Sequence, residues 1–496
     1  MSARSSGVAS VSARLREAIA RHAAAGRMAL VGRFEPVSYE TLGERIDGFA
    51  GAALKWGVRR GEVVGIATAR NVDTVALFLG LMQAGACPCV MEPRLAPDVA
   101  LLRMRAVGMK RLVVDRDHAT LGSDVAAAGM AVGLAEMKSV AAGSKLRPPA
   151  LAREDFAMMQ FTSGSTGQPK GVLLTQGNLL CNAEGVIAHT QLTPADRLLH
   201  VMPLHHTNGI NNQLVVPFIA GASVVLVERF RAEDIEDLLA EFKPTYMTGV
   251  PTMYSRVLPH LSDRKKRASL RFLRCGSAPI TPELHRQIEE AFGVPLVVSY
   301  GLSEATCTST MNPPTARRVG TVGTVLSGQK VALMRPGTLD EVAPLAQGEI
   351  CISGPCLMKG YVGAGAEQPI QEGWLRTGDL GRFDADGYLS ITGRIKDVII
   401  RGGENLSPQL IEGVIAEHRG VRTCCVVGGP HADLGEVPVA FVTLRAGARV
   451  EESEIKALVA ARLSRMYVPD QVRFVNALPE NAVGKLDRNA LRKLLA

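Results

Sequence analysis

The chain has 496 residues, of which 47% are hydrophobic and 21% are charged, and its net charge is +8. This length exceeds what one hydrophobic core ordinarily serves, so we expect two or more domains. The positive charge suits anionic ligands such as nucleotides. It does not favour nucleic acid as a partner, because the basic residues are scattered. Their one dense group, Arg264–Arg267, is predicted to be a solvated loop.

Neither a membrane span nor a disulfide framework is predicted. The longest apolar run, Val75–Met91, is interrupted by Gln83 and Pro88 and is too short to cross a bilayer. The nine cysteines include no CxxC pair, which predicts reduced thiols in a cytoplasmic protein. The Arg-containing N-terminus is predicted to form an amphipathic helix, with a transit peptide as the alternative.

Short β-branched runs alternate with helical stretches through most of the chain. Residues 62–68, 111–115, 222–228 and 294–301 are predicted strands, and residues 71–85 and 232–242 are predicted helices. A further helix is bounded by Thr281 as its N-cap, Pro282 at its first position and Gly293 as its end. This alternation predicts an α/β fold with mostly parallel sheets flanked by helices.

Later in the chain, residues 373–394 are predicted to form a β-hairpin that turns at Asp386-Gly387. After Arg394 a second, shorter series of strands and helices begins. About a hundred residues are enough for a small domain. We therefore predict a boundary near Lys396, with a large N-terminal domain over residues 1–395 and a small α+β domain over residues 396–496.

The most informative motif is the sequence FTSGSTGQPKGVLLT at residues 161–175. Its Ser, Thr and Gly residues suit a loop that offers backbone N–H groups and hydroxyls to a polyphosphate, and Lys170 adds a positive charge. The loop lacks the Gly-Lys-Ser/Thr ending of a Walker sequence. A flexible linker is the alternative, and the apolar flanks count against it.

This loop resembles the phosphate-binding signature of the superfamily of AMP-forming acyl-CoA synthetases, adenylation domains and luciferases. Four further segments resemble that family's signatures in the right order: YGLSEAT at 300–306, WLRTGD at 374–379, GRIKDVIIRGGENLSPQLIE at 393–412 and ENAVGKLDR at 480–488. The resemblance covers nearly the whole chain. It implies that residues 1–395 bind ATP and the acid, and that residues 396–496 form a mobile domain with the catalytic lysine and the thiol-transfer face.

The resemblance also implies a reaction. An enzyme of this kind, an AMP-forming acid–thiol ligase, joins a carboxylic acid to AMP, releases pyrophosphate from ATP, and then passes the acyl group to coenzyme A. ATP, Mg2+ and coenzyme A are thus the expected cofactors and co-substrates. The alternatives are a stand-alone adenylation enzyme that loads a separate carrier protein, and a non-catalytic acyl-adenylate binder. An oxygen-using luciferase relative is disfavoured by the low aromatic content of 4%.

The site residues follow from the matched positions. The resemblance implies ATP or AMP contacts by Thr162, Ser163, Gly164, Ser165, Thr166, Gly167, Lys170, Gly276, Ser277, Ala278, Tyr300, Gly301, Ser303, Asp379 and Arg394. It implies catalytic roles for Lys485, Thr166, Glu304 and His206, a magnesium site at Glu304 and Thr166, a hinge at Lys396, and a coenzyme A channel at Gly402 and Gly403. A lysine so near the C-terminus would otherwise be interpreted as a solvated side chain.

The sequence defines the acid substrate less closely than it defines the reaction. The segment PLHHTNGINNQL at 203–214 has no acidic residue to meet an α-ammonium group, which disfavours amino acids. Its asparagines make the approach polar, and other segments are similar to synthetases for small acids, including oxalyl- and malonyl-CoA types. Cys307 stands where the oxalyl type commonly has His, which counts against oxalate. Arg256 is either a partner for a second carboxylate or a helix-surface residue. A homo-oligomer is left open.

Overall fold

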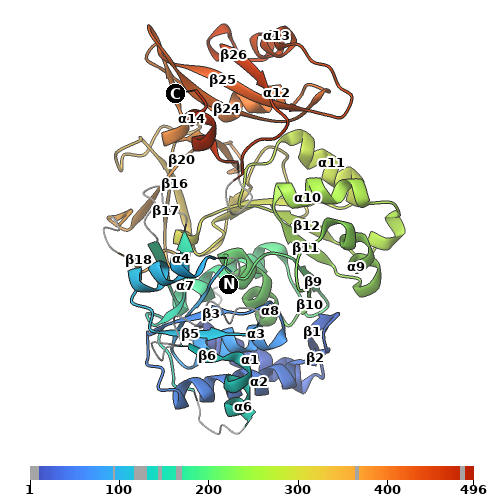
Figure 1. Ribbon diagram of the computed structural model, residues 1–496, viewed down its shortest axis with the longest axis vertical. Helices are drawn as coiled ribbons and strands as arrows, with labels where there is room; N and C mark the ends of the chain where they lie inside the picture. Colours follow the sequence, from blue (N-terminus) through green and yellow to red (C-terminus); the bar gives the residue numbers. More distant parts are fainter. Residues whose placement is uncertain are drawn as a thin grey trace.

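The computed structural model describes residues 10–92, 95–116, 131–142, 148–162, 170–363, 368–480 and 486–495. A large body of helices and sheets carries a smaller α+β unit at one end, and this unit contains the C-terminus (Figure 1). The predicted α/β class is confirmed.

The largest sheet among the described strands has the order β15-β14-β13-β12-β11-β9-β10-β1-β2. Its central strands, from β13 to β1, run parallel, and antiparallel strands close both edges. The strands are β1 Met28–Gly32, β2 Val37–Ser38, β9 Arg197–His200, β10 Ser223–Leu226, β11 Tyr246–Gly249, β12 Phe272–Cys275, β13 Leu296–Tyr300, β14 Thr310–Met311 and β15 Thr324–Val325.

Two further sheets belong to the large body. One is parallel, in the order β4-β3-β5-β6, and the other is antiparallel, in the order β18-β8-β7. Their strands are β3 Val63–Ala67, β4 Cys87–Val90, β5 Arg111–Val114, β6 Ala131–Gly133, β7 Phe156–Thr162, β8 Lys170–Thr175 and β18 Gly360–Val362. The strands expected at 62–68, 111–115, 222–228 and 294–301 are therefore confirmed.

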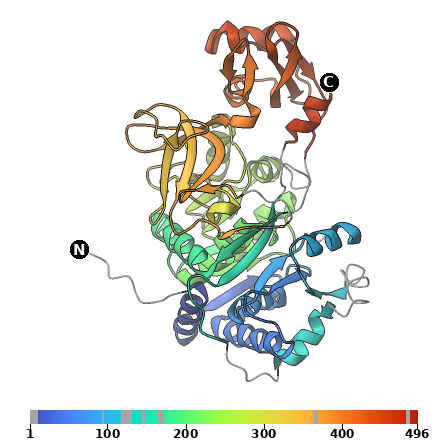
Figure 2. The same ribbon diagram turned by 90° about the vertical axis from the view of Figure 1, so that its left-hand side faces the viewer.

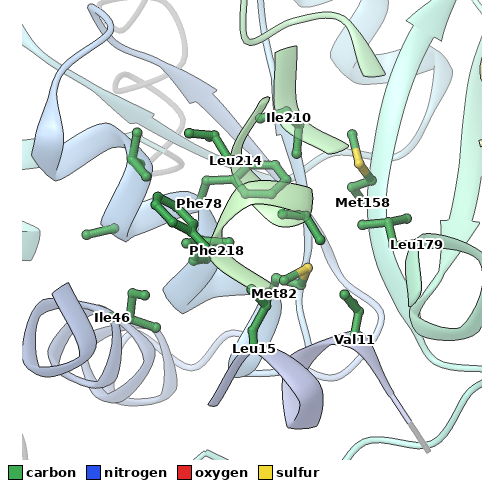
Figure 3. Packing of buried hydrophobic residues seen from close by; sticks show 14 of the residues in the cluster. Val11, Leu15, Ile46, Phe78, Met82, Met158, Leu179, Ile210, Leu214 and Phe218 are labelled. Atoms are coloured by element: carbon green, nitrogen blue, oxygen red, sulfur yellow. The ribbon is translucent and has the colours of Figure 1, made fainter. Parts of the chain in front are cut away.

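Helices pack on these sheets and between them. Those of the large body are α1 Val11–Ala24, α2 Tyr39–Lys55, α3 Val72–Gln83, α4 Pro97–Ala106, α6 Leu134–Ala142, α7 Gln176–Thr190, α8 Val216–Ala220, α9 Ile235–Phe242, α10 Pro251–Val257 and α11 Pro282–Phe292. Short turns are η3 Ala232–Asp234, η4 Leu258–His260, η5 Arg264–Arg267 and η6 Ser303–Ala305, and η2 Asn208–Val215 is a π-helix. Figure 3 shows Leu15, Phe78, Met82, Leu214 and Phe218 gathered in the core between them.

The predicted helix boundaries at residues 281–293 are confirmed by the geometry of α11. The Thr281 side chain accepts a hydrogen bond from the backbone N–H of Leu284 at 3.2 Å, and Gly293 adopts a left-handed conformation with φ +74°. A Ser/Thr cap satisfies one of the N–H groups that a helix start leaves free, and glycine enters the left-handed region without strain.

The predicted hairpin is also confirmed, within an antiparallel sheet of the order β16-β17-β20-β19 in which β21 pairs with β20. Gly387 has φ +81°, as its turn requires. The strands are β16 Lys330–Met334, β17 Gly348–Ser353, β19 Ile370–Gln371, β20 Trp374–Phe383 and β21 Leu389–Arg394. This sheet adds an antiparallel layer to the largely parallel body.

The C-terminal unit lies above the β16–β21 sheet in both views (Figures 1 and 2). Its elements are η7 Ile395–Asp397, β22 Ile399–Arg401, β23 Glu404–Leu406, α12 Pro408–Ile415, β24 Val421–His431, β25 Gly435–Leu444, α13 Glu452–Arg462, η8 Arg465–Tyr467, β26 Gln471–Phe474 and α14 Arg488–Lys493. The hydrophobic clusters divide between Ile391 and Ile399. A domain boundary near Lys396 remains a prediction that this division supports.

Three smaller expectations can also be compared with the structure. All nine cysteines are free thiols, seven of them buried, as predicted. None of the described helices is long and apolar enough to cross a bilayer. The prediction of a solvated loop at Arg264–Arg267 is wrong for Arg267, which is only 6% exposed. Its Nη1 donates to Glu236 Oε1 at 2.5 Å, because α9 brings a buried carboxylate beside the turn η5.

We expect Arg267→Met to lower the free energy of unfolding by about 3 kcal/mol, because it removes the buried cation beside the Glu236 carboxylate and leaves that carboxylate only the longer ion pair with Lys266, at 3.8 Å. Arg33→Met is the matched control: its ion pairs are 4.0 Å long and its side chain is 57% exposed, so its effect should stay below about 1 kcal/mol. Urea unfolding of both variants measures this. Equal midpoints would contradict a structural role for the Arg267–Glu236 pair.

Candidate nucleotide and acyl-transfer site

The candidate site draws residues from strands of three sheets. Tyr300 is the last residue of β13, Lys170 is the first of β8, and Asp379 lies within β20. In open α/β sheets the carboxyl ends of the strands border the ligand. Two groups of predicted residues come together here and form two corners of the site, one around Asp379 and one around Glu304.

The first corner is built around Asp379, whose carboxylate is buried with 6% exposure. The Tyr300 hydroxyl donates to its Oδ2 at 2.8 Å, and Arg394 Nε donates to its Oδ1. Burial and the negative charge of Asp379 raise the pKa of Tyr300, so this tyrosine stays a protonated donor. The corner thus holds a fixed carboxylate that can accept hydrogen bonds and an aromatic face beside it.

Residues behind Asp379 fix its backbone. The Thr377 hydroxyl accepts from the Asp379 N–H at 3.0 Å, and buried Glu349 accepts from the Gly378 N–H at 3.1 Å. Arg376 Nη2 lies 2.7 Å from Glu349 Oε2, so the charge of this buried carboxylate is paired. The sequence TGD therefore forms a supported turn within β20 rather than an ordinary surface turn.

The second corner links Glu304 to Lys170 through a residue that the sequence analysis missed. The Tyr361 hydroxyl donates to Glu304 Oε1 at 2.6 Å, and Lys170 Nζ lies 5.6 Å from the centre of the Tyr361 ring. Burial and Glu304 raise the pKa of Tyr361. A lone tyrosine in β18 carries no sequence signal, because only the β8–β18 pairing brings it beside Lys170.

A buried polar group adjoins this corner. The Thr207 hydroxyl lies 2.5 Å from Gln160 Oε1, to which it donates, and 3.0 Å from the hydroxyl of Ser303. Gln160 and Thr207 were not predicted, whereas Ser303 was. The group ties β7, the start of η2 and η6 to one another, next to the end of β7 at Thr162.

Two predicted glycines are required by the backbone. A Cβ at Gly301 would lie 2.1 Å from the Cys307 carbonyl oxygen, and one at Gly276 would lie 2.9 Å from Ser299 Oγ. Neither position can carry a side chain without movement. Ser277, which follows, has φ +65° and is exposed, and Ala278 is half-buried. The segment 276–278 thus follows β12 in a backbone conformation that depends on Gly276, and its contact with the nucleotide stays a prediction.

A third group of predicted and neighbouring residues lies in and around the π-helix η2. Asn212, in the π-helix η2, donates through Nδ2 to Cys307 Sγ at 2.9 Å and lies 3.1 Å from Thr308 Oγ1. Long π-helices are rare and frequently functional. The predicted catalytic His206 is half-buried, and its ring lies 4.4 Å from that of His205. Burial and the neighbouring His206 lower the pKa of His205 to about 3.

Six predicted residues lie outside the described residues: Ser163, Gly164, Ser165, Thr166, Gly167 and Lys485. The described residues that flank Lys485 are close together. Glu480 and Leu486 pair across an antiparallel bridge, and Glu480 Oε2 accepts from Arg256 Nη2 of α10 at 3.4 Å. One end of that segment therefore contacts the large body.

The hinge and channel predictions concern residues away from these corners. Lys396 is exposed in η7, and its carbonyl accepts from Arg492 of α14 at 3.4 Å. Gly402 and Gly403 form the two-residue turn between β22 and β23, with φ +58° and +86°. A turn with both residues at positive φ accounts for these glycines without a channel. Their role in a channel remains a prediction.

Residues 15–362 match the profile of the AMP-binding enzyme family, and residues 410–485 match that of the AMP-binding enzyme C-terminal domain. The chain belongs to the AMP-binding enzyme family. The family predicted from the sequence is confirmed, and so is an enzyme of the AMP-forming ligase class.

Individual members of the AMP-binding enzyme family show how broad the similarity is. A sulfoacetate–CoA ligase of Cupriavidus necator is 39% identical over 355 residues, which cover 70% of this chain and 68% of that protein. An oxalate–CoA ligase of Arabidopsis thaliana is 31% identical, over 87% of this chain and 88% of that protein. The ATP-bound MatB of Rhodopseudomonas palustris superposes with a TM-score of 0.89 at 29% identity, over 97% of this chain and 98% of that one. These relatives do not favour the alternatives of a carrier-loading enzyme or a non-catalytic binder.

We expect Asp379→Asn to raise the KM for ATP roughly tenfold or more, because it removes the charged acceptor that Tyr300 and Arg394 hold in place. Asp386→Asn is the control, since its carboxylate is 65% exposed and pairs with Arg318 in the hairpin. Steady-state kinetics with ATP as the varied substrate measures both. An unchanged KM in Asp379→Asn would contradict a nucleotide role for this corner.

Proposed function

We propose that this ligase activates a short, polar carboxylic acid with ATP, forming an acyl-adenylate and pyrophosphate, and then transfers the acyl group to coenzyme A to release AMP. The observation that carries this proposal is that both corners occur together in one site. A carboxylate held by Tyr300 and Arg394 suits ribose hydroxyls, and Lys170 with Glu304 suits a polyphosphate and its cation.

The residues of the second corner also fit a magnesium ion. A carboxylate accepts at about four positions, and the Glu304 carboxylate uses one of them for Tyr361. Its hard oxygens and the predicted Thr166 hydroxyl are the ligands that magnesium prefers. Bound there with ATP, magnesium would neutralise the charge that develops on the leaving pyrophosphate. Tyr361 would orient Glu304 toward it.

Two anions must meet in the first half-reaction, the acid carboxylate and the α-phosphate, and positive side chains must offset their repulsion. Lys170 and Arg394 lie at the two corners, and the family resemblance adds Lys485. A long, flexible ammonium group can bridge both anions. Lys485 would then act in adenylation and not in thiol transfer.

A short polar acid is favoured by the side chains near η2. Asn208, Asn211 and Asn212 are all buried there, and Asn212 contacts Cys307 and Thr308. The Oδ1 atoms of Asn211 and Asn212 have no hydrogen-bond partner among the described residues. An apolar acyl chain would leave these two acceptors unpaired, which is costly. The sulfoacetate and oxalate named for two relatives are also short and polar. Cys307, in place of the histidine common in oxalyl-CoA synthetases, argues against oxalate itself.

The proposed function is tested with the purified protein, ATP, magnesium, coenzyme A and a panel of acids. We expect acid-dependent pyrophosphate release and an acyl-CoA product with short polar acids, and little of either with long-chain acids or amino acids. Lys485→Ala should lower ATP–pyrophosphate exchange by roughly 100-fold or more while sparing thioester formation from a supplied acyl-adenylate. Lys493→Ala, an exposed lysine of α14, is the control.

The absence of acid-dependent pyrophosphate release would reject the function itself. If Lys485→Ala lowers the rates of both half-reactions equally, the proposal that Lys485 acts in adenylation alone is wrong.

The proposed hinge is supported by the way in which ion pairs change across it. Arg394 is paired with Asp379 in the large body, whereas Asp397 pairs with Arg492 and Arg488 of α14 in the C-terminal unit. Between them, Ile395 and Lys396 are exposed. Few dihedral angles need to change at such a junction for the C-terminal unit to rotate.

We expect Lys396→Pro to keep measurable pyrophosphate exchange but to lose most thioester formation, because proline fixes φ near −65°. Lys396→Ala removes the same side chain and leaves the backbone free, so it should keep both half-reactions. Thermal melting checks that neither variant is destabilised. If both half-reactions of Lys396→Pro fall together with its melting temperature, residue 396 is structural and the hinge lies elsewhere.

A further inference from the structure

Arg274, in the middle of the largest sheet, is among the largest fully buried side chains, with 1% exposure. It is the third residue of β12, and its backbone carbonyl accepts from the Tyr254 hydroxyl at 2.7 Å. Burial lowers the pKa of its guanidinium. A guanidinium nevertheless stays charged in proteins. The core of the large body thus contains a permanent cation.

This cation has no counter-ion in the part of the chain that the structure describes. No carboxylate there forms an ion pair with Arg274, and its Nε and Nη1 have no hydrogen-bond partner. The nearby titratable groups that act on its charge are Cys307, Tyr246 and Tyr254, all neutral at pH 7. Buried charges in folded proteins are otherwise paired or hydrogen-bonded, so this arrangement needs an explanation.

The surroundings of Arg274 are polar and equally unsatisfied. Thr248 is its register partner on β11, so the two side chains share one face of the sheet, and Tyr246 and Phe272 stack on that same face at 5.3 Å. Two side-chain oxygens on this face, Tyr246 Oη and Thr248 Oγ1, have no hydrogen-bond partner among the described residues. Both hydroxyls can donate to an anion.

The position of Arg274 relates it to the proposed reaction. It lies two residues before Gly276, or about 7 Å along a strand, and so close to the segment that is predicted to border the adenylate. Arg274 also acts electrostatically on Cys307, whose Sγ accepts from Asn212 of η2 at 2.9 Å. A group held by Arg274 would therefore lie near Cys307 and η2, where the proposed function places the acid.

We propose that Arg274 is a specificity-determining residue that binds a second anionic group, a carboxylate or a sulfonate, on a short acid substrate. This inference rests on the proposed function and narrows its acid to one with two anionic ends. Arg274 would form a charge-assisted pair with the distal oxyanion, helped by the hydroxyls on its face of the sheet. The carboxylate at the other end would remain free to attack the α-phosphate.

The test compares acids of matched size in ATP–pyrophosphate exchange: malonate and sulfoacetate against butyrate, propionate and monomethyl malonate. We expect the wild-type protein to prefer the two doubly charged acids. Arg274→Met should lower kcat/KM for them by roughly 100-fold or more, since the distal anion is then buried without a partner, and should leave the singly charged acids within about threefold. Arg274→Lys should retain part of the preference. Malonate and sulfoacetate distinguish a carboxylate from a sulfonate ligand.

Arg256→Met is the matched control, because Arg256 is the other arginine considered for a second carboxylate. Its side chain is 60% exposed and it pairs with Glu480, so we expect no change in the preference between the two series of acids. Thermal melting gives a readout that does not depend on catalysis. Replacing an unpaired buried cation with methionine should not lower the melting temperature, whereas removing a structural arginine should.

The inference is overturned if the wild-type protein prefers singly charged acids, or if Arg274→Met reduces both series equally. It is also overturned if Arg274→Met melts at a clearly lower temperature than the wild type, or if Arg256→Met abolishes the preference. A protein that adenylates only singly charged acids would reject this inference and keep the proposed function. A protein that releases pyrophosphate with no acid would reject the proposed function.

Discussion

The candidate site depends on one tight turn that follows strand β13. Gly301 packs so closely against the Cys307 carbonyl oxygen that a side chain there would overlap it, and the backbone then continues through two left-handed residues, Thr306 and Cys307. Left-handed non-glycine residues are held only where the surroundings determine them. The turn sends Tyr300 to the Asp379 corner and Glu304 to the Tyr361 corner. Five residues of chain thus set the spacing between the two corners.

The same turn also contacts the π-helix η2, beside which the acid is proposed to bind. Cys307 receives a hydrogen bond from Asn212 in η2, and the hydroxyl of Ser303 lies against that of Thr207 just before η2. The segment from Ser303 to Cys307, which contains Glu304, is therefore tied to η2 at both of its ends.

The sequence predicted local structure well where short-range chemistry decides it. The boundaries of α11 follow from Thr281 and Gly293, and the hairpin follows from Asp386-Gly387, because caps and turns are made by neighbours in the chain. Arg267 was misjudged since its partner Glu236 comes from a different helix. Charge alone does not tell whether a side chain is solvated or paired inside.

The same contrast between local and long-range contacts explains why only some of the site residues were predicted. Tyr300, Glu304, Asp379 and Arg394 lie in recognisable motifs, and the structure brings each into one of the two corners. Tyr361 and Gln160 carry no motif, and their places depend on which strands pair. Gly402 and Gly403 lie in a motif too, but the turn between β22 and β23 already requires them. A motif therefore identifies a position, but it does not tell whether the residue there is required by the backbone or by a ligand.

Arg274 was overlooked because one arginine in the run RFLRC resembles an exposed position on a strand edge. Only the order of the sheet shows that β12 lies between β11 and β13, covered on the face that Arg274 shares with Tyr246 and Phe272. The reaction brings together a nucleotide, an acid and a thiol, of which the first two are anions. A second anionic group on the acid would increase that repulsion, and it would be tolerated only where the protein has already buried a compensating positive charge. The uncompensated guanidinium at the end of β12 meets that requirement before any ligand arrives.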